Sequence, residues 1–115
     1  MKMIAKDCYE PVFQGDVMVM RIRAEDVPAD VKKLDTDVIA HSETGHHHVA
    51  KYADVLGGLN PMVMFLKAKQ EHVDVVHLRD YDTHETYRFF TDPGDMFIIK
   101  RQREQSPQGW RRVED

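Results

Sequence analysis

The sequence predicts an all-β protein, a single small sandwich or barrel of six to seven short strands that occupies residues 1–115. Three observations support this fold class. Apolar residues recur with a period of two in short runs, turn-forming residues separate those runs, and no segment has the apolar spacing of a long helix. Several short strands at this spacing are typical of a double or closed sheet, in which pairing protects the strand edges.

The first clear strand covers residues 17–23, directly after the turn-like residues 14–16. Its first four residues are all apolar, which is typical of a strand covered on both faces. Residues 28–34 could form one helical turn, with Asp26 near its start. We expect at most this one short helical turn in the chain.

A β-hairpin is predicted for residues 38–52, with strands at 38–41 and 46–52. The residues between them, 42–45, end in Gly45, which suits a tight turn. Gly57, Gly58 and Pro61 then break the pattern. The remaining strand candidates are 62–66, 72–78, 87–91 and 96–103, with a clear turn at 92–95, and 79–86 fits either a loop or a strand.

Composition and charge narrow the class of protein. The formal net charge of −4 argues against binding nucleic acid through a broad basic face, so nucleic acid is not an expected partner. Cys8 is the only cysteine, which excludes an internal disulfide and fits a reducing compartment. Neither a signal-peptide run nor a run of roughly 20 apolar residues is present. We therefore expect a cytoplasmic protein, or a component of something assembled in a cytoplasm, with no membrane partner.

The most unusual feature is the run of three histidines among the seven in the chain. On a strand, His46 and His48 share one face and His47 lies on the other. Such a pair can chelate an ion, and His41 lies across the predicted hairpin turn from it. His84 is a further candidate ligand, and imidazole with carboxylate suits zinc, iron or manganese. The alternative interpretation is an ordinary half-exposed strand surface.

Other polar and sulfur-containing residues have simpler explanations. Residues 80–85 would place Asp80, Asp82 and His84 on one face if extended, but such a run is more often a solvated loop. His72 and His77 are expected on a strand surface. Cys8 has no base at an informative spacing and is expected to be a bystander thiol. A last group of alternating residues, expected to serve core or interface packing, comprises Met18, Met20, Met62 and Met64.

His46 and His48 fall on an early predicted strand, and Pro93, Gly94 and Asp95 precede a late one. This arrangement resembles the cupin family. The resemblance implies a small β-barrel that holds a metal ion.

A longer pattern extends over most of the chain and comprises residues 14–17, 44–48, 84–85, 93–94, 101–104 and 110–113. This pattern resembles a group of small proteins from bacteria and their phages. The resemblance implies that the chain serves as an accessory component of a phage head or tail, a virion component assembled in a bacterial cytoplasm.

We therefore expect a non-enzymatic structural or accessory β protein, such as a head decoration or cement protein of a phage virion, with a His-based metal site. Self-association or docking on a larger protein assembly is the expected partnership. One alternative is a cupin-like metal-dependent enzyme. A second is a small-ligand or oligonucleotide-binding module, for which the stacking surface would comprise Tyr81, Tyr87, Phe89 and Phe90.

Overall fold

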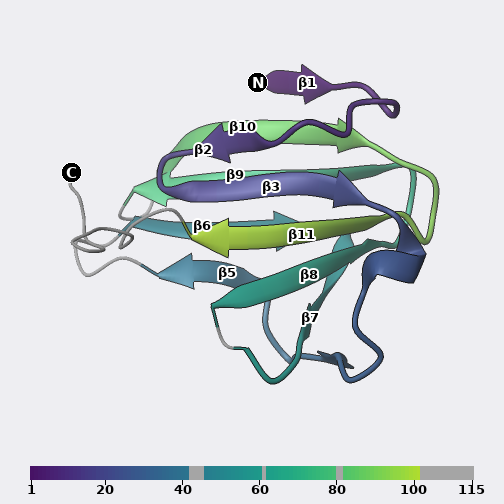
Figure 1. Cartoon of the computed structure of the whole chain (residues 1–115). Coiled ribbons are helices and arrows are strands. Elements are labelled where there is room, and N and C mark those ends of the chain that lie inside the picture. The colour runs from purple at the N-terminus through teal and green to yellow at the C-terminus, as the bar shows by residue number, and fades with distance from the viewer. Residues whose placement is uncertain (42–45, 61, 80–81, 102–115) are drawn as a thin grey trace, which may run out of the picture.

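The computed structural model describes residues 1–41, 46–60, 62–79 and 82–101. These residues form two packed β-sheets, so the all-β prediction is confirmed (Figure 1). The five-stranded sheet has the order β1 (Lys2–Ile4), β10 (Asp82–Phe90), β9 (His72–Arg79), β6 (His46–Lys51) and β5 (Val38–His41). The six-stranded sheet has the order β2 (Val12–Gln14), β3 (Val17–Ile22), β11 (Met96–Arg101), β8 (Val63–Ala68), β7 (Ala53–Gly57) and β4 (Lys32–Lys33).

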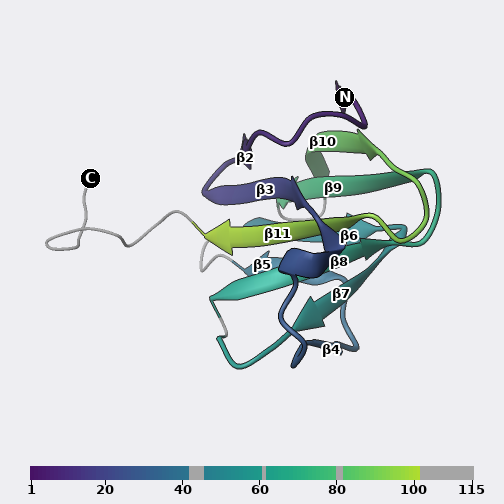
Figure 2. The same ribbon diagram turned by 45° about the vertical axis from the view of Figure 1, so that its right-hand side comes forward.

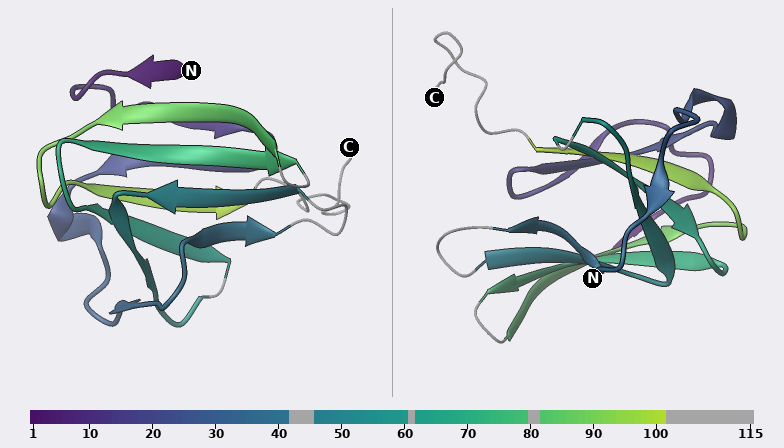
Figure 3. Two further views of the ribbon diagram at one scale, coloured as in Figure 1. Left: turned by 180° about the vertical axis from the view of Figure 1, so that it is seen from behind. Right: turned by 90° about the horizontal axis from the view of Figure 1, so that it is seen from below.

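The two sheets face each other as the layers of a sandwich, which Figure 3 shows from below. Their inner faces supply one apolar core, because alternate residues of each strand point inward. Leu66, Phe97 and Val75 are fully buried there. The rings of Phe89 and Phe97 meet edge to face across the two layers, with centroids 5.1 Å apart.

The pairing of two neighbouring strands in the five-stranded sheet fixes which of their residues lie opposite each other. β6 pairs antiparallel with β9, so that His48 lies opposite His77 and Ala50 lies opposite Val75. The predicted strands at 38–41 and 46–52 are present and pair with each other, as the predicted hairpin requires. The turn proposed for residues 42–45 lies outside the described residues.

The strand predicted to continue to residue 52 ends at Lys51, where the chain turns a corner. Tyr52 has a φ of 69°, an uncommon conformation for a residue with a side chain. There the chain leaves β6 in the five-stranded sheet and enters β7 in the six-stranded sheet. β7 thus lies where the sequence had offered no strand.

The helical turn predicted at residues 28–34 is wrong. The only helical turn among the described residues is a short 3-10 turn at Ala24–Asp26, and Lys32–Lys33 is a strand. Lys32 and Lys33 pair with Gly57 and Leu56, and the Leu34 N–H donates to the Val55 carbonyl at 2.7 Å. These long-range backbone hydrogen bonds outweigh a weak local helix preference.

The strand order leaves two short edge strands at the same side of the sandwich. β1 pairs with β10 over three residues, and β2 pairs with β3 over three residues. Figure 1 shows both strands at the top of the molecule, and Figure 2 shows the N-terminus on the same side. Each sheet therefore has one edge close to the first residues of the chain.

Candidate functional sites: a histidine pair and an outer apolar face

A buried glutamine fixes the orientation of His48. Gln14 on β2 is fully buried, and its Nε2 donates to the Val75 carbonyl at 3.0 Å and more weakly to the Glu85 carbonyl at 3.5 Å. Its Oε1 lies 2.9 Å from Nδ1 of His48, a buried residue on β6. Because Oε1 can only accept, His48 Nδ1 must donate. When the imidazole is neutral, its second ring nitrogen, Nε2, therefore carries the lone pair.

The Nε2 atom of His48 faces the carboxylate of Asp16. Asp16 Oδ1, in the turn between β2 and β3, lies 3.8 Å from His48 Nε2. The other carboxylate oxygen of Asp16 lies 3.8 Å from Nη2 of Arg101, at the end of β11. The His77 ring is stacked on His48, with centroids 4.3 Å apart and planes 9° apart. Three strands and one turn thus bring polar groups together at one end of the sandwich.

The structure divides the predicted histidine ligands. His48 faces the interior, whereas His47 lies opposite Leu78 and is half-buried, which agrees with the predicted alternation. The side chains of His41, His46 and His84 lie outside the described part of the chain, so their role as ligands stays a prediction. Within the residues that the structure describes, no group of three or more His, Cys, Asp or Glu side chains has a metal-binding arrangement.

Sequence reasoning missed Gln14 and Asp16 and misplaced His77. His77 was expected on a surface, but its register opposite His48 places it on the inner face, where it is half-buried. The signal for Gln14 was weak, since a polar residue before a turn is usually solvated. Only the pairing of β2 with β3 places Gln14 opposite the fully buried Val17 and turns it inward.

The outer face of the six-stranded sheet is mostly apolar. Buried and half-buried residues alternate along β3, so Met18, Met20 and Ile22 lie on its outer side. In the register, Met20 is opposite Ile98, which in turn is opposite Phe65. We call the following set the outer apolar face: Phe13, Met18, Met20, Ile22, Leu56, Val63, Phe65, Met96 and Ile98.

Most of the outer apolar face remains partly open to solvent. Phe65 and Met96 are buried, Phe13 is 49% exposed, and the other members are half-buried. The outer face of the five-stranded sheet differs, because there Arg88 holds Asp74 through two hydrogen bonds of 2.8 and 2.9 Å. The sequence had indicated that residues 17–20 are covered on both faces, but no second layer of described residues covers their outer side in Figure 3.

A pocket of about 440 Å³ opens over the outer apolar face. Phe65, Ile98 and Val63 contribute to its lining from the strands, and the rest comes from two loops together with Lys100. One of these loops carries Leu59, which is 91% exposed. The loop residues and the remaining strand residue that line the pocket are Pro28, Asp30, Val31, Gly58, Leu59, Asn60 and Lys100.

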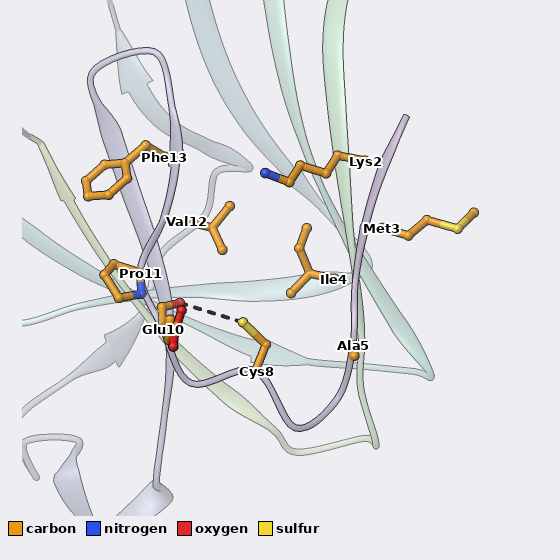
Figure 4. Close-up of a pocket in the computed structure, with 9 residues that line it drawn as sticks. All are labelled: Lys2, Met3, Ile4, Ala5, Cys8, Glu10, Pro11, Val12 and Phe13. Atoms are coloured by element: carbon orange, nitrogen blue, oxygen red, sulfur yellow. Dashed lines mark hydrogen bonds between the residues drawn. The ribbon is translucent and has the colours of Figure 1, made fainter.

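A second pocket, of about 540 Å³, lies between the edge strands β1 and β2. In Figure 4, Ile4 and Val12 face each other across this opening, and Phe13 points away from it. Cys8 is half-buried beside them, and its Sγ lies 4.0 Å from the Glu10 carbonyl oxygen. This pocket is an opening into the sandwich between two short edge strands, and its lining offers no nucleophile paired with a base.

Comparison of the chain with protein-family models, with curated proteins and with solved structures finds no match. Among the described residues, no helix is long and apolar enough to cross a membrane. The candidate sites thus rest on the geometry alone: the histidine pair at one end of the sandwich and the outer apolar face of the six-stranded sheet.

Proposed function

We propose that this chain is a non-enzymatic structural accessory protein that associates with further copies of itself through the outer apolar face. The observation that carries the proposal is the apolar content of that face across five adjacent strands, from Phe13 on β2 to Leu56 on β7. Contiguous apolar patches of this kind mark interaction surfaces, whereas isolated exposed apolar residues need no explanation.

The free energy for association comes from removing these side chains from water. Each Å² of apolar surface that is buried contributes roughly 25 cal/mol. Met18 and Met20 lie on β3, next to the central strand of the face, and methionine adapts its shape to a partner. The outer face of the opposite sheet carries the Arg88 and Asp74 ion pair.

A second copy of the chain suits this face because the face is complementary to itself. Phe65 and Ile98 line the pocket over this face, and Leu59, which also lines it, is 91% exposed. In a two-fold dimer the same patch serves both partners, so each Leu59 can enter the pocket of the other copy.

Charge at the rim of the pocket favours the same arrangement. Asp30 and Lys100 both line the pocket, and both are exposed. No ion pair joins either of them to another described residue within 4.0 Å. A two-fold axis that passes between these two residues would bring Lys100 of one copy against Asp30 of the other, which supports a second copy as the occupant.

The setting that we propose is a virion or a similar protein shell. The resemblance to small phage proteins supports a head or tail accessory role, and a small β-sandwich with an apolar outer face suits lateral attachment to neighbouring subunits. Self-association through the outer apolar face would then be one of the contacts that the protein makes in such an assembly.

The test is sedimentation velocity of the purified chain over a range of concentrations. We expect the wild type to form a dimer or larger species at 100 µM or below. Ile98→Glu places a charge at the centre of the face, so its dissociation constant should be at least tenfold higher. Thr86→Glu is the matched control, because Thr86 lies on β10 opposite Val76, away from the six-stranded sheet. Its oligomeric state should match the wild type.

Folding of the variants is checked by thermal unfolding, and Met20→Glu serves as a second substitution at the same face. A wild-type chain that stays monomeric at 100 µM would show the proposal to be wrong. Equal dissociation of Ile98→Glu and Thr86→Glu would also contradict it, because the contact would then not use this face.

A further inference from the structure

We propose that the N-terminal residues 1–6 form an arm that exchanges between two copies of the chain, so that β1 of one copy pairs with β10 of the other. The arm lies at the edge of the five-stranded sheet, where β10 is the neighbour of β1. Residues 7–11, which we call the hinge, connect the arm to β2. The exchange is separate from the outer apolar face, because that face belongs to the six-stranded sheet.

The contacts that hold the arm go to β10 and to the turn that follows it. β1 pairs with β10 in parallel over three residues. The Lys2 ammonium lies 5.4 Å from the centre of the Tyr87 ring on β10, and Lys6 Nζ lies 2.8 Å from Asp92 Oδ1. A second copy presents the same strand and the same turn, so each of these contacts can also form between two chains.

One side chain anchors the arm in the apolar core. Ile4 is 6% exposed and is the only buried residue of the six in the arm. On its other side lies the pocket of about 540 Å³ between β1 and β2, across which Ile4 faces Val12 in Figure 4. The arm is therefore held mainly by β10, and a second copy has to receive one apolar side chain from it.

The hinge can open without breaking a strand. In Figure 4 the chain reverses direction between Ala5 and Cys8, where the Cys8 N–H donates to the Ala5 carbonyl at 3.2 Å. Cys8 is half-buried, and the other hinge residues are exposed. Five extended residues span about 17 Å, so an opened hinge can carry the arm from its own sandwich to a neighbouring one.

A second copy is the partner that suits the vacated edge. Detachment of the arm leaves β10 with unpaired backbone N–H and C=O groups, and a sheet edge of this kind accepts another strand. The arm of a second copy already matches this edge in register and in the position of Ile4. Exchange of an identical element is a low-cost route to a dimer, because contacts within one chain are replaced by the same contacts between two.

The experiment traps the arm with a disulfide. Met3 lies opposite Arg88, and neighbouring strands are close enough for a disulfide between such a pair. The test protein carries Met3→Cys and Arg88→Cys, with Cys8→Ser to remove the natural thiol and Ile98→Glu to weaken the outer-face contact. It is unfolded with reductant, refolded at about 5 µM and at about 200 µM, and then oxidised.

Denaturing electrophoresis without reductant then separates the two forms. A closed chain gives an internally cross-linked monomer, whereas an exchanged pair gives a covalent dimer. We expect the share of covalent dimer to rise at least threefold from the lower to the higher concentration, because exchange joins two chains.

The matched control carries Lys51→Cys and Asp74→Cys in the same background. This pair joins β6 to β9, two strands that lie next to each other away from the arm. Both proteins lose the ion pair between Arg88 and Asp74, so its loss affects them equally. The control should give cross-linked monomer at both concentrations, and circular dichroism checks that both proteins are folded.

A test protein that gives only cross-linked monomer at about 200 µM would overturn the proposal, since the arm would then stay on its own chain. An equal share of covalent dimer in the control would overturn it too, because cross-linking would then not depend on the arm. Ile98→Glu is present in both proteins, so neither result would bear on self-association through the outer apolar face.

Discussion

Tyr87 is an ionisable residue whose pKa depends on its surroundings in the fold. Burial raises the pKa of the Tyr87 hydroxyl above its ordinary value of 10.0, and the charge of Glu85 and a hydrogen bond to its side chain raise it further. Tyr87 is two residues after Glu85 on β10 and lies opposite Val75, so it faces the core. The Lys2 ammonium lies 5.4 Å from the centre of its ring.

This raised pKa predicts a pH dependence of stability. Below about pH 10 Tyr87 is protonated in both the folded and the unfolded chain, so its contribution is fully present. As the pH rises further, the unfolded chain loses the proton first, and the contribution falls. The free energy of unfolding of the wild type minus that of Tyr87→Phe should therefore decrease between pH 9 and pH 11.5 in urea titrations. A difference that stays constant over this range would contradict the raised pKa.

The histidines show how far sequence reasoning reaches at the residue scale. Period-two alternation placed His48 and His47 on opposite faces of one strand, and the structure agrees. Alternation could not say which face is the inner one, nor which residues would meet His48 there. Gln14 is 34 residues away in sequence, and only the packing of the two sheets brings them together.

At the scale of the element, turns with strong local signals were predicted well. Residues 92–95 form the predicted turn, in which Asp95 N–H donates to the Asp92 carbonyl and the Asp95 carboxylate accepts from the Asp92 N–H. The same carboxylate binds the buried Arg21 at 2.7 Å. Gly94 has a φ of +97°, which residues with a side chain rarely adopt.

This turn yields a prediction that separates backbone strain from packing. A Cβ at Gly94 would meet no atom within 4 Å, so Gly94→Ala introduces no clash. We expect it to destabilise the protein by about 1 kcal/mol through the unfavourable φ alone. Urea unfolding measures this change. Ala5→Gly is the control, because it exchanges the same two residue types in the exposed N-terminal segment. An unchanged midpoint for Gly94→Ala would show that the turn tolerates a side chain.

Apart from β7, the elements that the sequence did not reveal are very short. β1, β2 and β4 have two or three residues each, which is too few for a period of two to be recognised. They exist because longer neighbouring strands provide hydrogen-bonding partners. The helical turn expected at residues 28–34 was wrong for the same reason, since pairing with β7 decided the conformation there.

At the scale of the whole molecule, the sequence predicted the class of fold and also carried the signal for the outer apolar face. A run of four apolar residues at 17–20 implied cover on both sides of a strand. The structure supplies that cover on the inner side only, where Val17 and Val19 are buried and Met18 and Met20 face outward. A second copy of the chain would supply the missing layer, which is the central claim of the proposed function.

Variants that exchange the charges of Asp30 and Lys100 test this contact most directly. Both residues line the pocket of one copy, and the proposed dimer places each against its opposite in the other copy. Sedimentation velocity should show dissociation constants about tenfold weaker for Asp30→Lys and for Lys100→Asp, because like charges then meet. The double variant, with both changes in one chain, should return to within about twofold of the wild type. Dissociation constants that are equal in all four proteins, or weakest in the double variant, would contradict the two-fold contact.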